Sequence, residues 1–190
     1  MKVLLYIINI PRLLFAYLVY TLEKNTISSD LNSFLSYGDR AQKFSKSNLL
    51  AFINLLIFHK EYRNILTLRL SGWKKILIYL LFPRLDSLYI TTKSKDIGYG
   101  ILIVHGFSTI INAKKIGENC QIYQQVTIGH GNGGKPIIGN NVRIYAGAII
   151  IGGITVGDNV TIGAGTVVTK SIPANTTVVG SSFRELGIRS

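Results

Sequence analysis

Aliphatic side chains recur at every sixth position through most of the second half of the chain. This period matches neither the roughly 3.6 residues per turn of an α-helix nor the two-residue alternation of a flat β-strand. It is typical of a repeat in which short strands meet at tight corners, about three strands to each turn of a coil. The aliphatic side chains then point inward, and successive turns stack as parallel strands about 4.8 Å apart. The positions are Val104, Ile110, Ile116, Ile122, Ile128, Ile138, Ile144, Ile150, Val156, Ile162 and Val168.

Glycine follows the aliphatic residue at several of these positions. The corners of such a coil are crowded, and a glycine there leaves room for the neighbouring turn and can also adopt positive φ. We therefore expect corners at these glycines, which are Gly117, Gly129, Gly139, Gly157 and Gly163.

The repeat is interrupted once, because Ile128 and Ile138 are ten residues apart instead of six. Four extra residues must leave the coil there, within the polar, glycine-rich segment 129–136. Loops that leave a rigid scaffold often carry functional residues. We therefore expect this loop to border a site.

The first half of the chain has a different pattern, with apolar segments separated by polar, basic ones. Residues 1–97 contain two of the 19 glycines. We expect helices over 48–70 and 73–82, the second ended by Pro83, and a polar linker with weak helix over 28–47. The fold class is therefore α+β, with a helical part over 1–90 followed by a parallel β-helix over 91–190 that ends in a C-terminal tail.

The first 22 residues are long and apolar enough to cross a bilayer, but Pro11 and Arg12 lie in the middle, where an arginine is costly. We expect a helix that lies on a membrane surface or packs within an oligomer, ended or kinked at Pro11. A membrane span and an uncleaved signal are the alternatives. The net charge of +12 suits an anionic membrane or a phosphate-bearing ligand. No motif for nucleic acid is present.

Four segments resemble the hexapeptide-repeat acyltransferases, which fold as left-handed parallel β-helices. The closer likeness is to serine acetyltransferases and to capsule or colanic-acid O-acetyltransferases, over roughly residues 90–187. The resemblance implies acetyl-CoA as co-substrate, no metal, and a homotrimer with active sites between neighbouring coils. The segments are Ile101-Leu102-Ile103-Val104-His105-Gly106, Gln125-Val126-Thr127-Ile128-Gly129, Ile138-Gly139-Asn140-Asn141-Val142 and Ile162-Gly163-Ala164-Gly165-Thr166-Val167-Val168.

His105 matches the catalytic histidine of the serine acetyltransferases, and we expect it to act as the general base toward a hydroxyl group. Tyr123 follows it by one coil turn and Tyr145 by two, which predicts an outward row of acceptor-binding side chains. In the loop, His130 is a second candidate for the catalytic or acceptor-binding role, and Lys135 is a candidate acceptor contact.

Five further positions match residues that bind the coenzyme in related acetyltransferases. Lys170 and Arg184 suit the phosphates, and small residues allow the pantetheine arm to approach backbone amides. The other three are Ala146, Ala164 and Thr169.

The remaining histidine and the single cysteine have other expected roles. A three-histidine zinc site is not expected, because His59 lies far back in the helical part. We expect it to be a helix-surface or core histidine. Cys120 takes the place of a small residue in the repeat, so we expect it to fill the core.

The chain departs from the serine enzymes at three positions. Val104 stands where they carry an aspartate before the catalytic histidine, Ile90 where a second aspartate orients that histidine, and Gly134 where their loop has an arginine. An apolar side chain cannot pair with an ammonium group, and glycine cannot pair with a carboxylate.

From these departures we expect an acetyl-CoA-dependent O-acetyltransferase acting on a sugar hydroxyl of a cell-surface polysaccharide or its precursor. Such an enzyme would work in the cytoplasm or at the inner face of the cytoplasmic membrane. The alternatives are a serine O-acetyltransferase of cysteine biosynthesis and a non-catalytic β-helix scaffold at a membrane.

Overall fold

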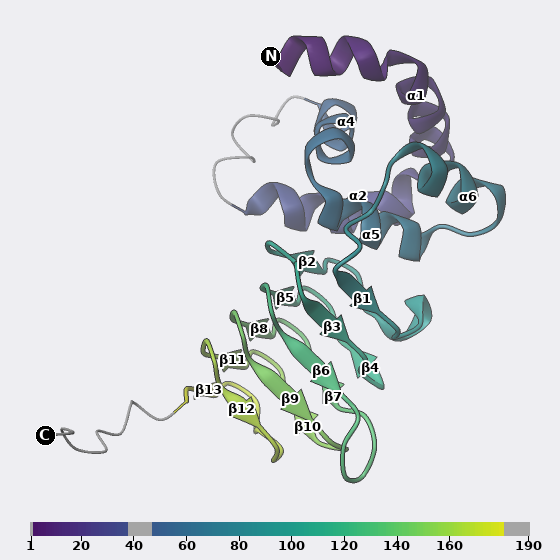
Figure 1. The fold of residues 1–190 in the computed structure, drawn as a ribbon. Helices are drawn as coiled ribbons and strands as arrows, with labels where there is room; N and C mark the ends of the chain where they lie inside the picture. The colour runs from purple at the N-terminus through teal and green to yellow at the C-terminus, as the bar shows by residue number, and fades with distance from the viewer. Residues whose placement is uncertain (1, 38–46, 181–190) are drawn as a thin grey trace, which may run out of the picture.

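The computed structural model of the protein describes residues 2–37 and 47–180. In these residues the helices gather at one end of the molecule, and a coil of short strands runs away from them (Figure 1). The helices are α1 (Lys2–Leu22), α2 (Lys24–Ser36), α4 (Asn48–Phe58), α5 (Lys60–Arg69) and α6 (Gly72–Leu81), with a 3-10 turn at η1 (Ser94–Asp96).

The helical part differs from the expectation at α2. The predicted linker over 28–47 was wrong for its first part, because α2 continues to Ser36. This segment forms a helix since Ile27, Leu31 and Phe34 lie on one face and are buried. The rest of the predicted linker, residues 38–46, lies outside the described residues.

Pro11 lies inside α1 and does not end it. A proline removes one hydrogen bond from the helix interior, and Figure 1 shows that α1 changes direction along its length. Among the described residues, none of the helices has both the length and the hydropathy that crossing a bilayer requires.

The strands form three parallel sheets that wind into a left-handed β-helix, so the predicted α+β fold class is confirmed. One sheet contains β1 (Leu88–Ile90), β3 (Thr109–Ile111), β6 (Thr127–Gly129), β9 (Ile149–Ile151) and β12 (Val167–Val168). The second contains β4 (Lys115–Ile116), β7 (Ile137–Ile138) and β10 (Thr155–Val156). The third contains β2 (Leu102–Ile103), β5 (Gln121–Ile122), β8 (Arg143–Ile144), β11 (Thr161–Ile162) and β13 (Thr177–Val178).

The predicted register holds along most of the coil. Ile128 pairs with Ile150 across β6 and β9, so the four extra residues leave between β6 and β7 as expected. Ile110 is an exception, because it is 43% exposed while Ile111 is fully buried. The corner before it has one residue more than the repeat allows, and two of its residues, His105 and Ser108, have positive φ.

Four of the five glycines of the repeat serve close stacking, the exception being Gly129, and none of the five has positive φ. A side-chain carbon added to Gly117 would lie 2.5 Å from the carbonyl oxygen of Gly139 in the next turn. Asparagines instead take the left-handed conformation, which they tolerate better than most residues. Their amides also bond along the corner, Asn141 to Asn159 at 3.0 Å and Asn159 to Asn175 at 2.8 Å.

Cys120 is fully buried in the coil, as expected of a core residue. Burial raises the pKa of the Cys120 thiol to about 11. The thiol therefore stays protonated at neutral pH and is not a nucleophile there.

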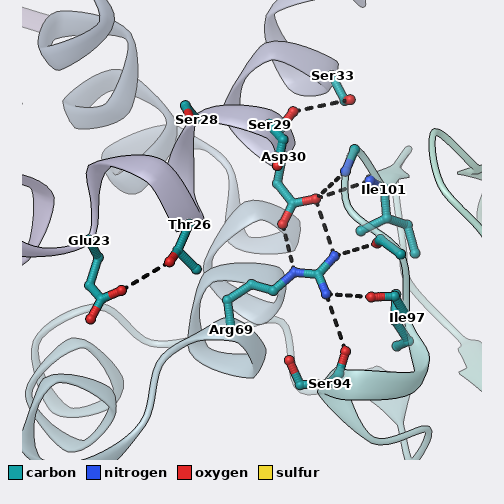
Figure 2. A network of polar contacts seen from close by, with 12 residues as sticks. Glu23, Thr26, Ser28, Ser29, Asp30, Ser33, Arg69, Ser94, Ile97 and Ile101 are labelled. Atoms are coloured by element: carbon teal, nitrogen blue, oxygen red, sulfur yellow. Dashed lines mark hydrogen bonds and ion pairs between the residues drawn. The ribbon is translucent and has the colours of Figure 1, made fainter.

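A buried ion pair joins the helical part to the first turn of the coil (Figure 2). The carboxylate of Asp30 on α2 accepts from Nε of Arg69 on α5 at 2.8 Å. It also accepts from the backbone N–H groups of Gly100 and Ile101 at 2.8 and 3.1 Å. Asp30 therefore holds two helices and the coil together.

Arg69 completes this contact from the other side. Its guanidinium donates to the carbonyl oxygens of Ile97 at 2.7 Å and Gly98 at 2.6 Å. The two side chains are 4% and 3% exposed, so neither charge is solvated by water. The charges are balanced only while the helices sit on the coil, because the backbone groups that bond to them belong to the coil.

The replacement Asp30→Asn should destabilise the protein by about 3–5 kcal/mol, because it leaves the buried guanidinium without a counter-charge. Urea unfolding followed by circular dichroism measures this loss. Asp86→Asn makes the same change at an exposed carboxylate and should stay within about 0.5 kcal/mol of the wild type. Equal stability of the two variants would contradict the role of the pair.

Candidate functional site

His105 lies two residues after the end of β2, at the corner where the chain passes from the third sheet to the first. Its φ of 53° is in the left-handed region, which is uncommon for a residue with a side chain. The N–H of Phe107 donates to its carbonyl oxygen at 2.5 Å, which closes the corner. The imidazole is exposed, as predicted for an outward position.

A cavity of about 230 Å³ opens beside His105, between the helical part and the first turn of the coil. Its exposed wall is more polar than apolar, with polar groups from two histidines, a glutamate and a tyrosine beside phenylalanine and aliphatic residues. The lining residues are Phe34, Tyr37, Phe58, His59, Glu61, Ile103, Val104 and His105.

The bend between α4 and α5 brings His59 and Glu61 to this cavity. Sequence reasoning placed His59 in the helical part without connecting it to His105, and it missed Glu61. No spacing relates these residues to the repeat. The only signal was the short polar segment between two apolar helices.

Arg63 fixes this bend. Its guanidinium donates to the carbonyl oxygens of Leu56 at 2.6 Å, Ile57 at 2.7 Å and Pro83 at 2.7 Å. The bonds to Leu56 and Ile57 satisfy carbonyl groups at the C-terminal end of α4. Burial lowers the pKa of Arg63 from its usual value. The bend is therefore a rigid part of the cavity wall.

Tyr123 and Tyr145 lie in a row along the same corner, with ring centroids 4.9 Å apart. Tyr37, at the end of α2, meets the edge of Tyr123 at 6.4 Å. Burial and the neighbouring phenol of Tyr37 raise the pKa of Tyr123. The structure thus contains the expected row and adds Tyr37 to it. Binding of an acceptor by these tyrosines stays a prediction.

The other candidates divide between two edges of the coil. Ala146 and Ala164 lie one turn apart on the edge of His105, where Gly165 N–H donates to the Ala146 carbonyl oxygen at 2.9 Å. Thr169 and Lys170 follow β12 and therefore lie on the next edge. They line a cavity of about 280 Å³ near the end of the coil. Arg184 lies outside the described residues.

The loop 129–136 also leaves from this second edge, between β6 and β7 (Figure 1). The N–H groups of Gly131 and Gly134 donate to each other's carbonyl oxygens at 3.0 Å, and Asn132 accepts from Gly153 N–H at 2.9 Å. His130 and Lys135 are exposed there. Within one chain, the loop does not share the edge that carries His105.

In residues 2–37 and 47–180, no group of three or more histidine, cysteine, aspartate or glutamate side chains is placed to hold a metal ion.

Comparison with known proteins identifies the repeat. Residues 135–170 match the family described as bacterial transferase hexapeptide (six repeats). The serine acetyltransferase of Synechococcus elongatus is 48% identical over 90 residues, which are 44% of this chain and 36% of that protein. That of Staphylococcus xylosus is 43% identical over 91 residues, 45% of this chain and 42% of that protein. The matched segment thus spans about two fifths of these relatives.

Solved structures extend the likeness to the helical part. The serine acetyltransferase of Brucella abortus strain S19 superposes with a TM-score of 0.63 at 25% identity, covering 91% of this chain and 73% of that one. A structure of serine acetyltransferase from the same strain in complex with coenzyme A gives 0.58 at 28% identity, covering 86% and 67%.

Residues 135–170 therefore resemble a hexapeptide-repeat transferase family. More particularly, the protein is similar to serine acetyltransferases, in sequence over the coil and in fold over most of the chain.

These comparisons contradict the expectation of a polysaccharide acceptor, because the curated and solved relatives are serine acetyltransferases. That expectation rested on Val104 and Gly134, which cannot pair with the charged groups of serine. It assumed that the charged groups of serine must contact residues of the coil or its loop. The cavity beside His105 is also lined from the helical part, so the departures do not decide the acceptor.

Proposed function

We propose that the protein is an acetyl-CoA-dependent O-acetyltransferase whose acceptor is a small hydroxyl compound of the serine kind. The observation that carries this proposal is the position of His105. It stands at an exposed corner beside a cavity, on a coil similar in sequence to serine acetyltransferases. The volume of the cavity suits a small acceptor better than a long chain of sugars.

The proposed mechanism uses His105 as a general base. Its imidazole takes the proton of the acceptor hydroxyl while the oxygen attacks the thioester carbonyl of acetyl-CoA. Backbone N–H groups stabilise the tetrahedral oxyanion. The carbon–sulfur bond then breaks, and the departing thiolate takes the proton from the imidazolium. The products are the O-acetylated acceptor and coenzyme A.

Suitable contacts for the coenzyme lie both on the edge of the coil that carries His105 and on the edge that carries Lys170. Lys170 offers a charge for its phosphates, and Thr169 lines the same cavity. Ala146 and Ala164 leave room for the pantetheine arm beside the tyrosine row. The relative from Brucella abortus has been solved with coenzyme A.

We also propose a homotrimer, because within one chain the candidate residues lie on two different edges of the coil. His105 lies on one edge, whereas the loop 129–136 and Lys170 lie on the next. Three coils packed side by side would place the second edge of one copy against the first edge of its neighbour. Each active site would then lie between two copies.

The helical part has a surface that suits a membrane. Large apolar side chains are exposed on α1 and on α6, and Arg12 of α1 donates to the Leu81 carbonyl oxygen, so the two helices adjoin. Apolar patches of this kind mark interaction surfaces. The exposed residues are Ile10, Leu14, Phe15, Tyr17, Leu18 and Leu22 on α1, and Trp73, Ile76, Tyr79 and Leu80 on α6.

The charges on α1 and α6 favour an anionic lipid surface as the partner of this apolar surface. Neither α1 nor α6 contains an aspartate or a glutamate, whereas both carry basic residues, including the exposed Arg12 and Lys75. Two copies meeting through this face would bring like charges together, but an anionic lipid surface would attract them. We therefore propose peripheral association with the inner face of the cytoplasmic membrane.

The replacement His105→Asn tests the proposed base. Asparagine tolerates the left-handed backbone conformation of this corner, so the fold should be retained while the general base is lost. Release of coenzyme A from acetyl-CoA with L-serine should fall by roughly 10²–10⁴-fold. Unchanged release would contradict the assignment, and a loss seen only in His130→Ala would move the base to the loop.

Membrane association predicts that the protein co-sediments with phosphatidylglycerol-containing vesicles at low salt and is released at high salt. Replacing Ile76 and Leu80 together by glutamate should abolish binding, because it puts negative charge on the apolar face. Tyr89→Glu makes the same kind of change at an exposed position of the coil and should bind like the wild type. No binding at low salt would contradict the proposal.

A further inference from the structure

Among the described residues, Glu61 is the only carboxylate that lines the cavity at His105. From the coil, Ile103, Val104 and His105 line this cavity, and none of the three is acidic. A ligand in the cavity would therefore have a base at one side and a carboxylate on the helical side.

The backbone holds Glu61 close to the corner of His105. Glu61 lies in the first turn of α5. A side-chain carbon added to Gly106, the residue after the base, would lie 3.4 Å from Cγ of Glu61. The side chain thus passes over the backbone that carries His105. Asn64, one turn further along α5, ties this helix to the start of the coil by accepting from Leu85 N–H at 2.8 Å.

Among the described residues, the close ion pairs are Asp30 with Arg69 and Glu23 with Lys74, and neither includes Glu61. Burial lowers the pKa of Arg63, and the charge of Glu61 acts on the same group and raises its pKa by a smaller effect. The guanidinium of Arg63 nevertheless directs its hydrogen bonds to three carbonyl oxygens and not to the carboxylate. A partly buried carboxylate that faces a cavity is stabilised by a cation. The ligand can supply it.

We propose that Glu61 binds the protonated amino group of the acceptor, so that the acceptor class is a small amino alcohol with its hydroxyl at His105. This inference rests on the proposed function and adds the residue that selects the acceptor. It also accounts for Val104, because the negative charge that the coil lacks beside the base comes from α5 instead.

Glu61 could alternatively serve the helix alone, since an acidic residue in the first turn stabilises the N-terminal end of a helix. The two roles differ in what they predict. A purely structural residue affects all acceptors alike, whereas a residue that binds the amino group affects only acceptors that carry one.

The test compares three acceptors in the coenzyme A release assay with the Glu61→Gln variant. L-Serine has a hydroxyl, an amino and a carboxylate group, ethanolamine lacks the carboxylate, and 3-hydroxypropanoate lacks the amino group. The variant should raise the KM for serine and ethanolamine by roughly 10- to 100-fold, the loss of one charge-assisted hydrogen bond. The KM for 3-hydroxypropanoate should not change.

Two further variants serve as controls. Glu61→Asp keeps the charge and should recover part of the affinity for serine. Glu118→Gln makes the same change at an exposed position of the coil and should leave every KM unaltered. A Glu61→Gln protein with equal losses for all three acceptors, or with none, would overturn the proposal.

Failure of the proposed function would give a different result. The wild-type protein would then release no coenzyme A with any of the three acceptors. Titration calorimetry with ethanolamine still decides the role of Glu61 in that case. Weaker binding by Glu61→Gln than by the wild type supports it, and equal binding or none overturns it.

Discussion

The ion pair between Asp30 and Arg69 determines how the two parts of the molecule sit on each other. Both charges are removed from water, and their hydrogen bonds are completed by backbone groups of residues 97–101 in the coil. Separating the parts would leave two buried charges without partners, which is far more costly than losing an exposed ion pair. The pair therefore makes the helical part a fixed wall of the site.

This docking gives the cavity its chemistry. The coil alone presents His105 at an exposed corner above two apolar residues, Ile103 and Val104. The helical part adds aromatic walls and Glu61 through the bend that Arg63 holds. The repeat thus provides a rigid frame, and in the proposed function the helices decide which small molecule fits beside His105.

The sequence predicted much of the coil, because a six-residue period with buried aliphatic side chains permits few other arrangements. It also predicted the loop at 129–136 and the row of Tyr123 and Tyr145. The prediction failed at Ile110, where the corner of His105 takes an extra residue and two positive φ angles shift the register. A strict repeat count cannot show such a change, since Ile110 and Ile111 are both aliphatic.

The site was predicted less completely than the fold. His105 was predicted because it stands on the repeat, and its role stays a prediction, whereas Glu61 belongs to a helix whose position depends on long-range contacts. No spacing in the chain connects the two. The incorrect inference of a polysaccharide acceptor has the same origin, because it considered only the residues of the coil and its loop as partners for the acceptor.

A crystal structure of the protein with coenzyme A and L-serine would show whether the acceptor binds where the helical part meets the coil. We expect serine in the cavity between α5 and β2, with its hydroxyl within hydrogen-bonding distance of the His105 imidazole. We also expect coenzyme A along the edge of Ala146 and Ala164, with its phosphates at Lys170 of a neighbouring copy. Serine bound away from this cavity, with the helical part making no contact to it, would contradict the proposed site.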